Sequence, residues 1–236
     1  CTLATEKSTW KRIIRVFRQS RGIEVENIVD WNEKHVLAKA QFDCNVLTRK
    51  AVCDTSAGFV ERETHRNTTW QQARFEVCHH KWVDMAETDG GIALINDSKY
   101  GMGLLENSMS LSLLRATVRP DVTSDLGHHE FSYMIYPHGD DFVKAEINNI
   151  AFEYNIPIGK ADLTCENSFG ELYMQTMKMS EKGHMIIVRL SEQNGRRGKI
   201  KLGGKVKILN FLEDVVDVTN TIEYKPFEII TIGIDA

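Results

Sequence analysis

The sequence predicts an all-β fold with one helix, and two patterns support that prediction. Apolar residues alternate with polar ones in several stretches, for example Ile23, Val25, Val29 and Trp31, which are separated mostly by acidic residues. Successive side chains of a strand point to opposite faces, so this alternation is typical of a strand with one buried face. The unbroken apolar run at 92–95 instead indicates a strand buried on both faces. Further alternating stretches occur at 36–42, 109–113 and 131–135.

Residues 140–154 break this rhythm and predict the helix. Val143, Ile147, Ile150 and Tyr154 recur at helical spacing. Asp140 or Asp141 could cap the start of the helix, and Pro157 lies just beyond its end, where a helix cannot continue.

The composition changes after this helix, which predicts a second domain. The stretch 159–170 is rich in Asn, Ser, Asp and Gly and has little periodicity. Short strands are expected beyond it at 172–177, 185–190, 199–202, 206–211 and 227–234. Hairpin turns are expected at 183–184 and 195–198. We therefore expect a large sandwich over 1–160 and a small antiparallel β-sandwich over 161–236.

The composition of the chain limits which partners and which cellular compartment we expect for it. The 236 residues are 42% hydrophobic and 26% charged, which is enough apolar material for a core. The net charge of -4 gives no reason to expect nucleic acid or an anionic membrane as a partner, and no apolar run is long enough to span a bilayer. The first residues do not resemble a signal peptide. The cysteine count is odd, at 5, and no pair has Cys-x-x-Cys spacing, so reduced thiols in a cytoplasmic protein are expected.

Two histidine pairs, 79–80 and 128–129, are the evident candidates for metal ligands. Adjacent side chains on a strand point to opposite faces, so one pair rarely holds one ion. A site would need a histidine from each pair together with a carboxylate such as Glu130 or Asp84. We expect no metal site, with one histidine of each pair buried and the other in solvent.

A polar cluster made by His65, Arg66 and Asn67 precedes Trp70. An aromatic face can stack on a sugar ring while polar neighbours bind its hydroxyls, so the cluster is a candidate sugar platform. A polar turn whose tryptophan anchors the core is the alternative that the residues alone favour.

The turn-rich segment 96–101 directly follows the apolar run, which is a usual place for working residues on a rigid scaffold. Asp97 and Lys99 could bind sugar hydroxyls there. A hairpin turn with its charges in water is an equal alternative.

The sequence marks no catalytic residues. A glycosidase needs two carboxylates about 5 to 9.5 Å apart, and none of the 33 acidic residues is singled out as such a pair. The chain also has no Gly-x-Ser-x-Gly, phosphate-binding Gly-rich loop or His-Glu-x-x-His motif.

Several segments together resemble glycoside hydrolase family 38, in its cytosolic, vacuolar and bacterial branch. Residues 58–70, GFVERETHRNTTW, are similar to the family's GYVERPTHRNTSW. Residues 73–84, ARFEVCHHKWVD, and 91–101, GIALINDSKYG, resemble ARFEVxxHKWAD and GVALLNDCKYG. Shorter similarities stand in the family's order at 111–115, 129–133, 137–139, 187–190 and 225–229. The sequence departs from the pattern at 54–58, Glu63 and Ser98.

The resemblance implies a galactose mutarotase-like supersandwich at 1–160 and a smaller sandwich after it. In the family, the nucleophile and the ligands of a divalent metal, usually zinc, belong to a separate catalytic domain. No position here matches those residues, so we expect neither catalytic residues nor metal ligands in this chain. A sandwich loop approaches the sugar in these enzymes, and 96–101 is the best match. Expected substrate-binding residues are Asn96, Asp97, Lys99, Tyr100, His65, Arg66 and Trp70.

The resemblance favours one function among three. The chain would be the non-catalytic C-terminal portion of an α-mannosidase acting on terminal α-mannosyl residues. Its partners would be an N-terminal catalytic domain and a mannosyl oligosaccharide or glycoside, and contacts between copies of the chain are compatible with this role. The alternative is a stand-alone carbohydrate-binding module. A mutarotase-like enzyme, the third hypothesis, would use His128, His129 and Glu130.

Overall fold

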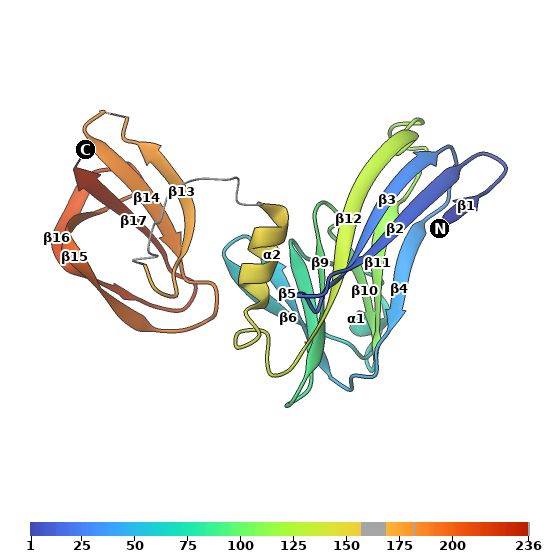
Figure 1. Cartoon of the computed structure of the whole chain (residues 1–236), viewed down its shortest axis with the longest axis horizontal. Coiled ribbons are helices and arrows are strands. Elements are labelled where there is room, and N and C mark those ends of the chain that lie inside the picture. The colour runs from blue at the N-terminus through green and yellow to red at the C-terminus, as the bar shows by residue number, and fades with distance from the viewer. Residues whose placement is uncertain (157–168, 182, 236) are drawn as a thin grey trace. The chain divides into compact units, whose positions relative to one another are not determined.

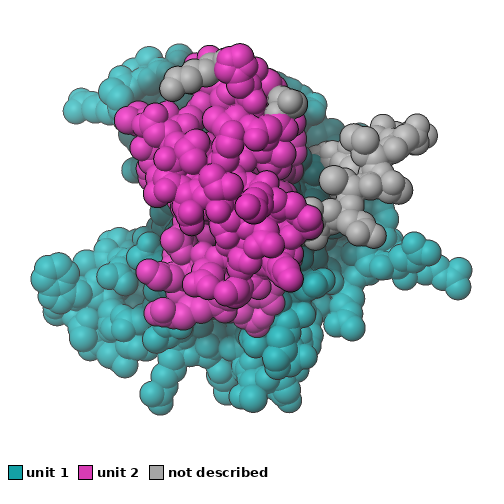
Figure 2. All heavy atoms as spheres, turned by 90° about the vertical axis from the view of Figure 1, so that its left-hand side faces the viewer, with its two compact units in different colours: residues 1–55, 60–159 teal, residues 56–59, 160–236 magenta. Residues whose placement is uncertain are grey.

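The computed structural model describes residues 1–156, 169–181 and 183–235 and confirms the all-β prediction. The chain separates into two compact units, coloured teal and magenta in Figure 2. Unit 1 holds residues 1–55 and 60–159, and unit 2 holds residues 56–59 and 160–236. The expected boundary between 160 and 161 lies outside the described residues and stays a prediction. Within the described ranges, no helix has the length and apolar character needed to cross a bilayer.

Unit 1 contains two sheets (Figure 1). The eight-stranded sheet has the strand order β1-β2-β3-β12-β9-β8-β5-β6. In that order, its strands span Thr2–Ala4, Thr9–Val16, Ile23–Trp31, Gly127–His138, Gly91–Asn96, Trp82–Ala86, Lys50–Thr55 and Gly58–Glu63. In the order β4-β11-β10-β7, the four-stranded sheet contains Ala38–Asp43, Ser108–Leu114, Gly101–Leu105 and Val77–Cys78. The strands expected from alternation at 23–31, 36–42, 109–113 and 131–135 are therefore present, with boundaries shifted by a few residues.

The hydrophobic core of unit 1 lies between these sheets. Val25 and Val29 of β3 and Leu94 of β9 belong to the same buried cluster as Met109 and Leu111 of β11. Burying a side chain of this size contributes about 1.5–3 kcal/mol. Because alternate residues of each strand fill this layer, the two sheets form a sandwich, as predicted.

Helix α2, Ile147–Asn155, packs against β8 and β9. It buries Ile147 and Ala151, and Asn148 accepts a hydrogen bond from the indole of Trp82 at 3.2 Å. The ring of Phe142 lies 5.1 Å from that indole. With the sandwich core beneath β9 and α2 against it, residues 93–95 are fully buried. The expectation of a strand at 92–95 that is buried on both faces is thus confirmed for 93–95, whereas Ile92 is only partly buried.

The predicted helix begins seven residues later than expected, at 147 rather than 140. The Asp141 carboxylate accepts hydrogen bonds from the backbone N–H groups of Val143 and Lys144, at 2.9 and 3.0 Å, which closes a local turn. Glu146 then adopts a left-handed conformation, with φ of 55°, which interrupts any continuous helix. A second, one-turn helix, α1, spans Thr69–Gln72.

Unit 2 contains a five-stranded antiparallel sheet in the order β13-β14-β17-β15-β16. These strands are Tyr173–Met179, Met185–Ser191, Ile229–Asp235, Gly198–Leu209 and Val215–Tyr224. Figure 1 shows that these strands are curved, and unit 2 has a hydrophobic core of its own. That core includes Val188, Leu190, Ile222 and Ile232.

Two details of unit 2 differ from expectation. The strands predicted at 199–202 and 206–211 form one strand, β15, with a register shift between Lys201 and Val206 that accommodates the two glycines between them. The expected hairpin turn at 195–198 is wrong, because β14 and β15 do not pair and β17 lies between them. The expected turn near Gly183 is confirmed: it joins β13 to β14, which pair antiparallel.

Candidate functional site

The candidate loop, residues 97–100, links the two sheets of unit 1. It leaves β9, in the eight-stranded sheet, and enters β10, in the four-stranded sheet. The hairpin alternative is therefore wrong, since β9 and β10 belong to different sheets. The loop instead crosses from one layer of the sandwich to the other.

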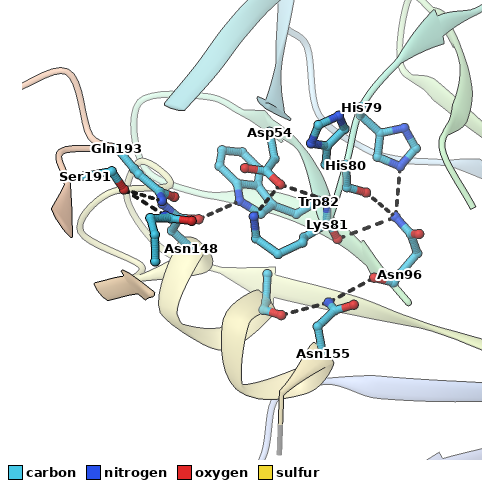
Figure 3. A network of polar contacts seen from close by, with 12 residues as sticks. Asp54, His79, His80, Lys81, Trp82, Asn96, Asn148, Asn155, Ser191 and Gln193 are labelled. Carbon is cyan, nitrogen blue, oxygen red and sulfur yellow. Dashed lines mark hydrogen bonds and ion pairs between the residues drawn. The ribbon is translucent and has the colours of Figure 1, made fainter. Parts of the chain in front are cut away.

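Asn96, the last residue of β9, anchors the start of this loop (Figure 3). Its side chain is buried, at 1% exposure. The amide nitrogen donates to the carbonyl oxygen of His80 at 2.9 Å, and lies 3.0 Å from Nε2 of His79. The amide oxygen accepts a hydrogen bond from the backbone N–H of Lys99 at 2.7 Å. Every polar atom of this side chain is thus engaged within the protein, and Asn96 fixes the shape of the loop.

His79 is the buried partner of Asn96. Because the Asn96 amide nitrogen can only donate, Nε2 of His79 must accept, which requires a neutral imidazole. Burial lowers the pKa of His79 to about 4, although the backbone carbonyl of Tyr100, as a hydrogen-bond acceptor, acts in the opposite direction. The histidine is therefore uncharged at neutral pH, and its charge state is coupled to the geometry of the loop.

Further hydrogen bonds hold the loop from strand β12 and helix α2. The Asp97 carboxylate accepts from the backbone N–H and the hydroxyl of Ser132, at 2.7 and 2.9 Å. The hydroxyl of Tyr154 reaches the same serine at 2.6 Å. The Asn155 amide donates to the Asn96 carbonyl oxygen at 3.1 Å (Figure 3). Both adjoining elements therefore fix this connection.

Lys99 and Tyr100 are the loop side chains with unused polar capacity. The ammonium of Lys99 lies 4.3 Å from the centre of the Phe131 ring. Burial lowers the pKa of Lys99, while Asp125 and Asp97 raise it. Tyr100 is 54% exposed, and its ring lies 6.1 Å from that of His80. These two residues could offer a hydrogen-bond donor and an aromatic face to a ligand.

The second candidate group, which includes His65, Arg66 and Trp70, surrounds helix α1. Thr68 caps this helix in a capping box with Gln71. Trp70 is 84% exposed, so the alternative in which it anchors the core is wrong. His65 and Arg66 line a small depression together with Glu63, Arg74 and Glu76, whereas Trp70 is absent from that lining. None of the three depressions found among the described residues is lined by residues 96–100.

The histidine pairs behave differently from each other. His79 is buried and His80 is half-buried, whereas in the second pair His128 is exposed and His129 is half-buried. His128 lies between Asp30 and Glu130, at 2.8 and 3.1 Å, and these bonds raise its pKa. His128 and Glu130 do meet, as a mutarotase-like site would need, but both side chains are exposed and lie outside all three depressions.

No three His, Cys, Asp or Glu side chains in the described part of the chain are grouped so as to hold a metal ion. Asp84, the other carboxylate considered for such a site, has a different role. It accepts a hydrogen bond from Nε2 of His138 at 2.7 Å, in a pair that is 1% and 2% exposed. Burial lowers the pKa of His138, but the bond and the charge of Asp84 outweigh burial and raise it. Burial has the opposite effect on a carboxyl group, and it raises the pKa of Asp84.

A buried ion pair close to the loop was also missed by the sequence reasoning. Lys81 contacts Asp54 at 2.9 Å, and the carboxylate of Asp54 is fully buried. The same carboxylate accepts from the backbone N–H of Lys81 at 2.8 Å (Figure 3). Lys81 falls in a segment that resembles the family, whereas Asp54 falls in one that departs from it, so no sequence signal marked the two as partners.

Comparisons with known proteins place both units in one family. The sequence profile of the glycosyl hydrolases family 38 C-terminal domain matches residues 1–123. That of the glycosyl hydrolases family 38 C-terminal beta sandwich domain matches residues 171–232.

Curated relatives agree with these matches. Alpha-mannosidase G of Dictyostelium discoideum is 35% identical over 92% of this chain and 22% of its own length. Alpha-mannosidase 2C1 of Mus musculus is 37% identical over 71% of this chain and 17% of its own length. This chain therefore spans about a fifth of the length of these relatives.

A solved structure shares the fold. An alpha-mannosidase from Enterococcus faecalis V583 superposes with a TM-score of 0.76 over 96% of this chain and 28% of the other, at 15% identity.

Proposed function

The chain belongs to glycoside hydrolase family 38, and we propose that it is the non-catalytic C-terminal portion of an α-mannosidase. In this role it completes the active site of a catalytic domain that acts on terminal α-mannosyl residues. That domain would hold the catalytic carboxylates and the divalent metal, usually zinc, because the described residues of this chain offer no ligand set for one. The setting we propose is cytoplasmic, with a mannosyl oligosaccharide or glycoside as substrate.

One observation carries the proposal: the loop between β9 and β10 is held rigidly while it leaves two side chains unused. Residues Asn96 and Asp97 are bonded on both sides, so the backbone of the loop is positioned before any ligand arrives. A pre-positioned loop loses little conformational entropy when it contacts a sugar. Lys99 and Tyr100 would then bind the sugar, the first by donating to an oxygen and the second through its ring or hydroxyl.

The chemistry of Lys99 suits this task. A half-buried ammonium has three N–H donors and no acceptor, and it has lost part of its hydration. Neither the ion pairs nor the hydrogen bonds found among the described residues satisfy its side-chain donors. A sugar oxygen that supplies an acceptor would restore part of the lost hydration energy, so the contact should be favourable.

The test is Lys99→Ala in the longer α-mannosidase, with an aryl α-mannoside as substrate. We expect kcat/KM to fall about tenfold or more, equivalent to about 1.4 kcal/mol of transition-state stabilisation. The melting temperature should hardly change, and Lys99→Arg should restore part of the activity. Lys34→Ala is the matched control, because Lys34 is exposed on the same unit. Unchanged kinetics in Lys99→Ala would refute the role of this residue.

Stand-alone carbohydrate binding is a second candidate, favoured by the 84% exposure of Trp70. The two proposals differ in what the 236-residue chain does alone. As an accessory portion it should not hydrolyse an aryl α-mannoside even with added divalent metal, and it should have negligible affinity for mannose. Millimolar or tighter binding of mannose that Trp70→Ala abolishes would favour the module, and substantial turnover would refute both.

A further inference from the structure

The outer face of the four-stranded sheet carries a groove that the proposed function does not use. Three depressions adjoin one another there, because they share Arg66 and Glu76 at one junction and Leu37 and Arg115 at the other. The central depression has a volume of 660 Å³, and the one beyond Arg115 has a volume of 560 Å³. Together they form one extended groove, which narrows beside Arg74 to a depression of only 10 Å³ and which we call the β10–β11 groove.

The floor of this groove is hollow because two strands carry their smallest residues there. Gly103 of β10 lies in register with Ser110 of β11, and both residues line the central depression. A Cβ atom placed on Gly103 would lie 2.5 Å from the hydroxyl oxygen of Ser110, closer than such contacts allow. The missing side chain at Gly103 and the short one at Ser110 leave room for a ligand above the strands.

Positive charge predominates along the groove. Its lining includes five cationic side chains, Lys39, Arg66, Arg74, Arg115 and Arg119, and two carboxylates, Glu63 and Glu76. Glu76 is paired with Lys39 at 2.5 Å, and Glu63 accepts a hydrogen bond from Gln71. No ion pair found within the described ranges involves the four arginines. The chain as a whole has a net charge of -4, so this surface is a local reversal of sign.

Three further lining residues, Gln41, Phe75 and Ser110, suit a sugar chain better than a nucleic acid. Ser110 and Gln41 supply a hydroxyl and an amide that can bond to sugar hydroxyls. Phe75, 71% exposed, supplies one aromatic face. Single-stranded nucleic acids are usually held by several aromatic side chains on which successive bases stack. A single aromatic residue in an extended cationic groove does not provide that platform.

We propose that the β10–β11 groove binds an acidic oligosaccharide, a sugar chain that carries carboxylate or sulfate groups. The arginines would pair with the acidic groups, since the guanidinium group matches planar and tetrahedral oxyanions in a bidentate manner. The serine and glutamine would contact the ring hydroxyls. The groove lining contains no residue of 96–100, so this binding is separate from the role proposed for that loop.

Isothermal titration calorimetry on the 236-residue chain tests the proposal with four probes. They are a heparin-derived tetrasaccharide, tetragalacturonate, neutral mannotetraose and a single-stranded tetradeoxynucleotide. We expect at least one acidic sugar to bind about tenfold more tightly than both other probes, a difference of about 1.4 kcal/mol. Raising the salt concentration from about 0.05 to 0.5 M should weaken that binding, because exposed ion pairs are screened. Tetragalacturonate carries carboxylates alone, whereas the heparin fragment carries sulfates as well, so tighter binding of the heparin fragment would show that sulfate adds to the affinity.

Substitutions locate the site. Arg66→Ala and Arg115→Ala should each weaken the binding about fivefold or more, and the double substitution should weaken it further. Arg197→Ala is the matched control, since Arg197 is exposed in unit 2 and far from the groove in sequence; it should leave the affinity unchanged. Circular dichroism confirms that each variant is folded. Absence of binding by both acidic sugars, equally tight binding of the nucleotide or of mannotetraose, or an equal loss in Arg197→Ala would each overturn the proposal.

Discussion

The loop at 96–100 and the segment at 65–75 were both candidate sugar-binding regions, yet they are built in opposite ways. The first is held by a buried polar network in which Asn96 is 1% exposed. The second exposes Trp70 and Phe75 by 84% and 71% and rests on a helix of one turn. In the loop, polar side chains maintain the backbone shape. In the segment, polar and aromatic side chains face the surroundings.

This difference shows that a residue singled out in the sequence can have one of two roles: it can maintain the structure, or it can contact a ligand. A buried amide such as Asn96 cannot be removed without leaving its partners unsatisfied, so its effect is on positioning and stability. An exposed ring such as Trp70 contributes little to folding, so any effect of its removal must come from a ligand or partner. Substitutions at His79, Asn96 and Trp70 test this contrast.

Acid should weaken unit 1 through His79. The pKa of this histidine is lowered from 6.5 to about 4, so its contribution to stability is fully present above pH 6.5. It is lost as pH falls towards 4, because the unfolded chain then binds a proton that the folded chain rejects. The total loss is ~3 kcal/mol at 1.36 kcal/mol for each pKa unit. Urea denaturation between pH 7 and pH 4 measures it.

His79→Gln provides the comparison, since glutamine can accept the Asn96 hydrogen bond but does not titrate. Between pH 7 and pH 4, the unfolding free energy of this variant should decrease by ~3 kcal/mol less than that of the wild type. His184→Gln alters an exposed histidine of unit 2 and should leave the slope unchanged. An identical slope in wild type and His79→Gln would show that the buried ring does not control this transition.

Asn96→Ala should destabilise unit 1 by about 2 kcal/mol, because the backbone groups of His80 and Lys99 lose their buried partner. Chemical denaturation of the 236-residue chain measures this change. Asn67→Ala, in the exposed segment, should alter the unfolding free energy by less than about 0.5 kcal/mol. Equal effects of the two asparagines would remove the distinction between the regions.

Trp70→Ala should have the smallest effect, below about 0.5 kcal/mol on stability, because the indole buries little surface. Thermal unfolding followed by circular dichroism measures it. A loss larger than about 1 kcal/mol would mean that the ring packs within the fold, which would bring this segment closer in character to the loop.

Much of the fold could be predicted because burial imposes a simple period on strands. Val25 and Val29 alternate with polar residues since their sheet has one inner face, and the run at 92–95 lacks alternation because α2 covers the other face. The helix start was misplaced because local bonds of Asp141, rather than apolar spacing, determine where the chain turns. Strand β16 was missed although Val216, Val218 and Ile222 lie two or four residues apart, because several of its apolar side chains are exposed.

The site was less predictable, because it depends on partners distant in sequence. Nothing local distinguishes Asn96, which turns inward to His79, from Asp97, which bonds to Ser132 on another strand. Likewise the pairing of Asp84 with His138 joins residues 54 positions apart. Sequence reasoning identified the correct segments through motif similarity, whereas the direction in which each side chain points required the fold.

Because residues 97–100 cross from one sheet to the other, the conformation of this loop depends on the distance between the two sheets. Its two ends are attached to different sheets, so a change in the volume of the core between the sheets should alter the distance that the loop spans. Leu111 and Met102 of β11 and β10 face that core and are fully buried. Enlarging or trimming these side chains would therefore shift Tyr100 relative to Asn96 without touching the loop, and mechanical strain in the core would be read out at its surface.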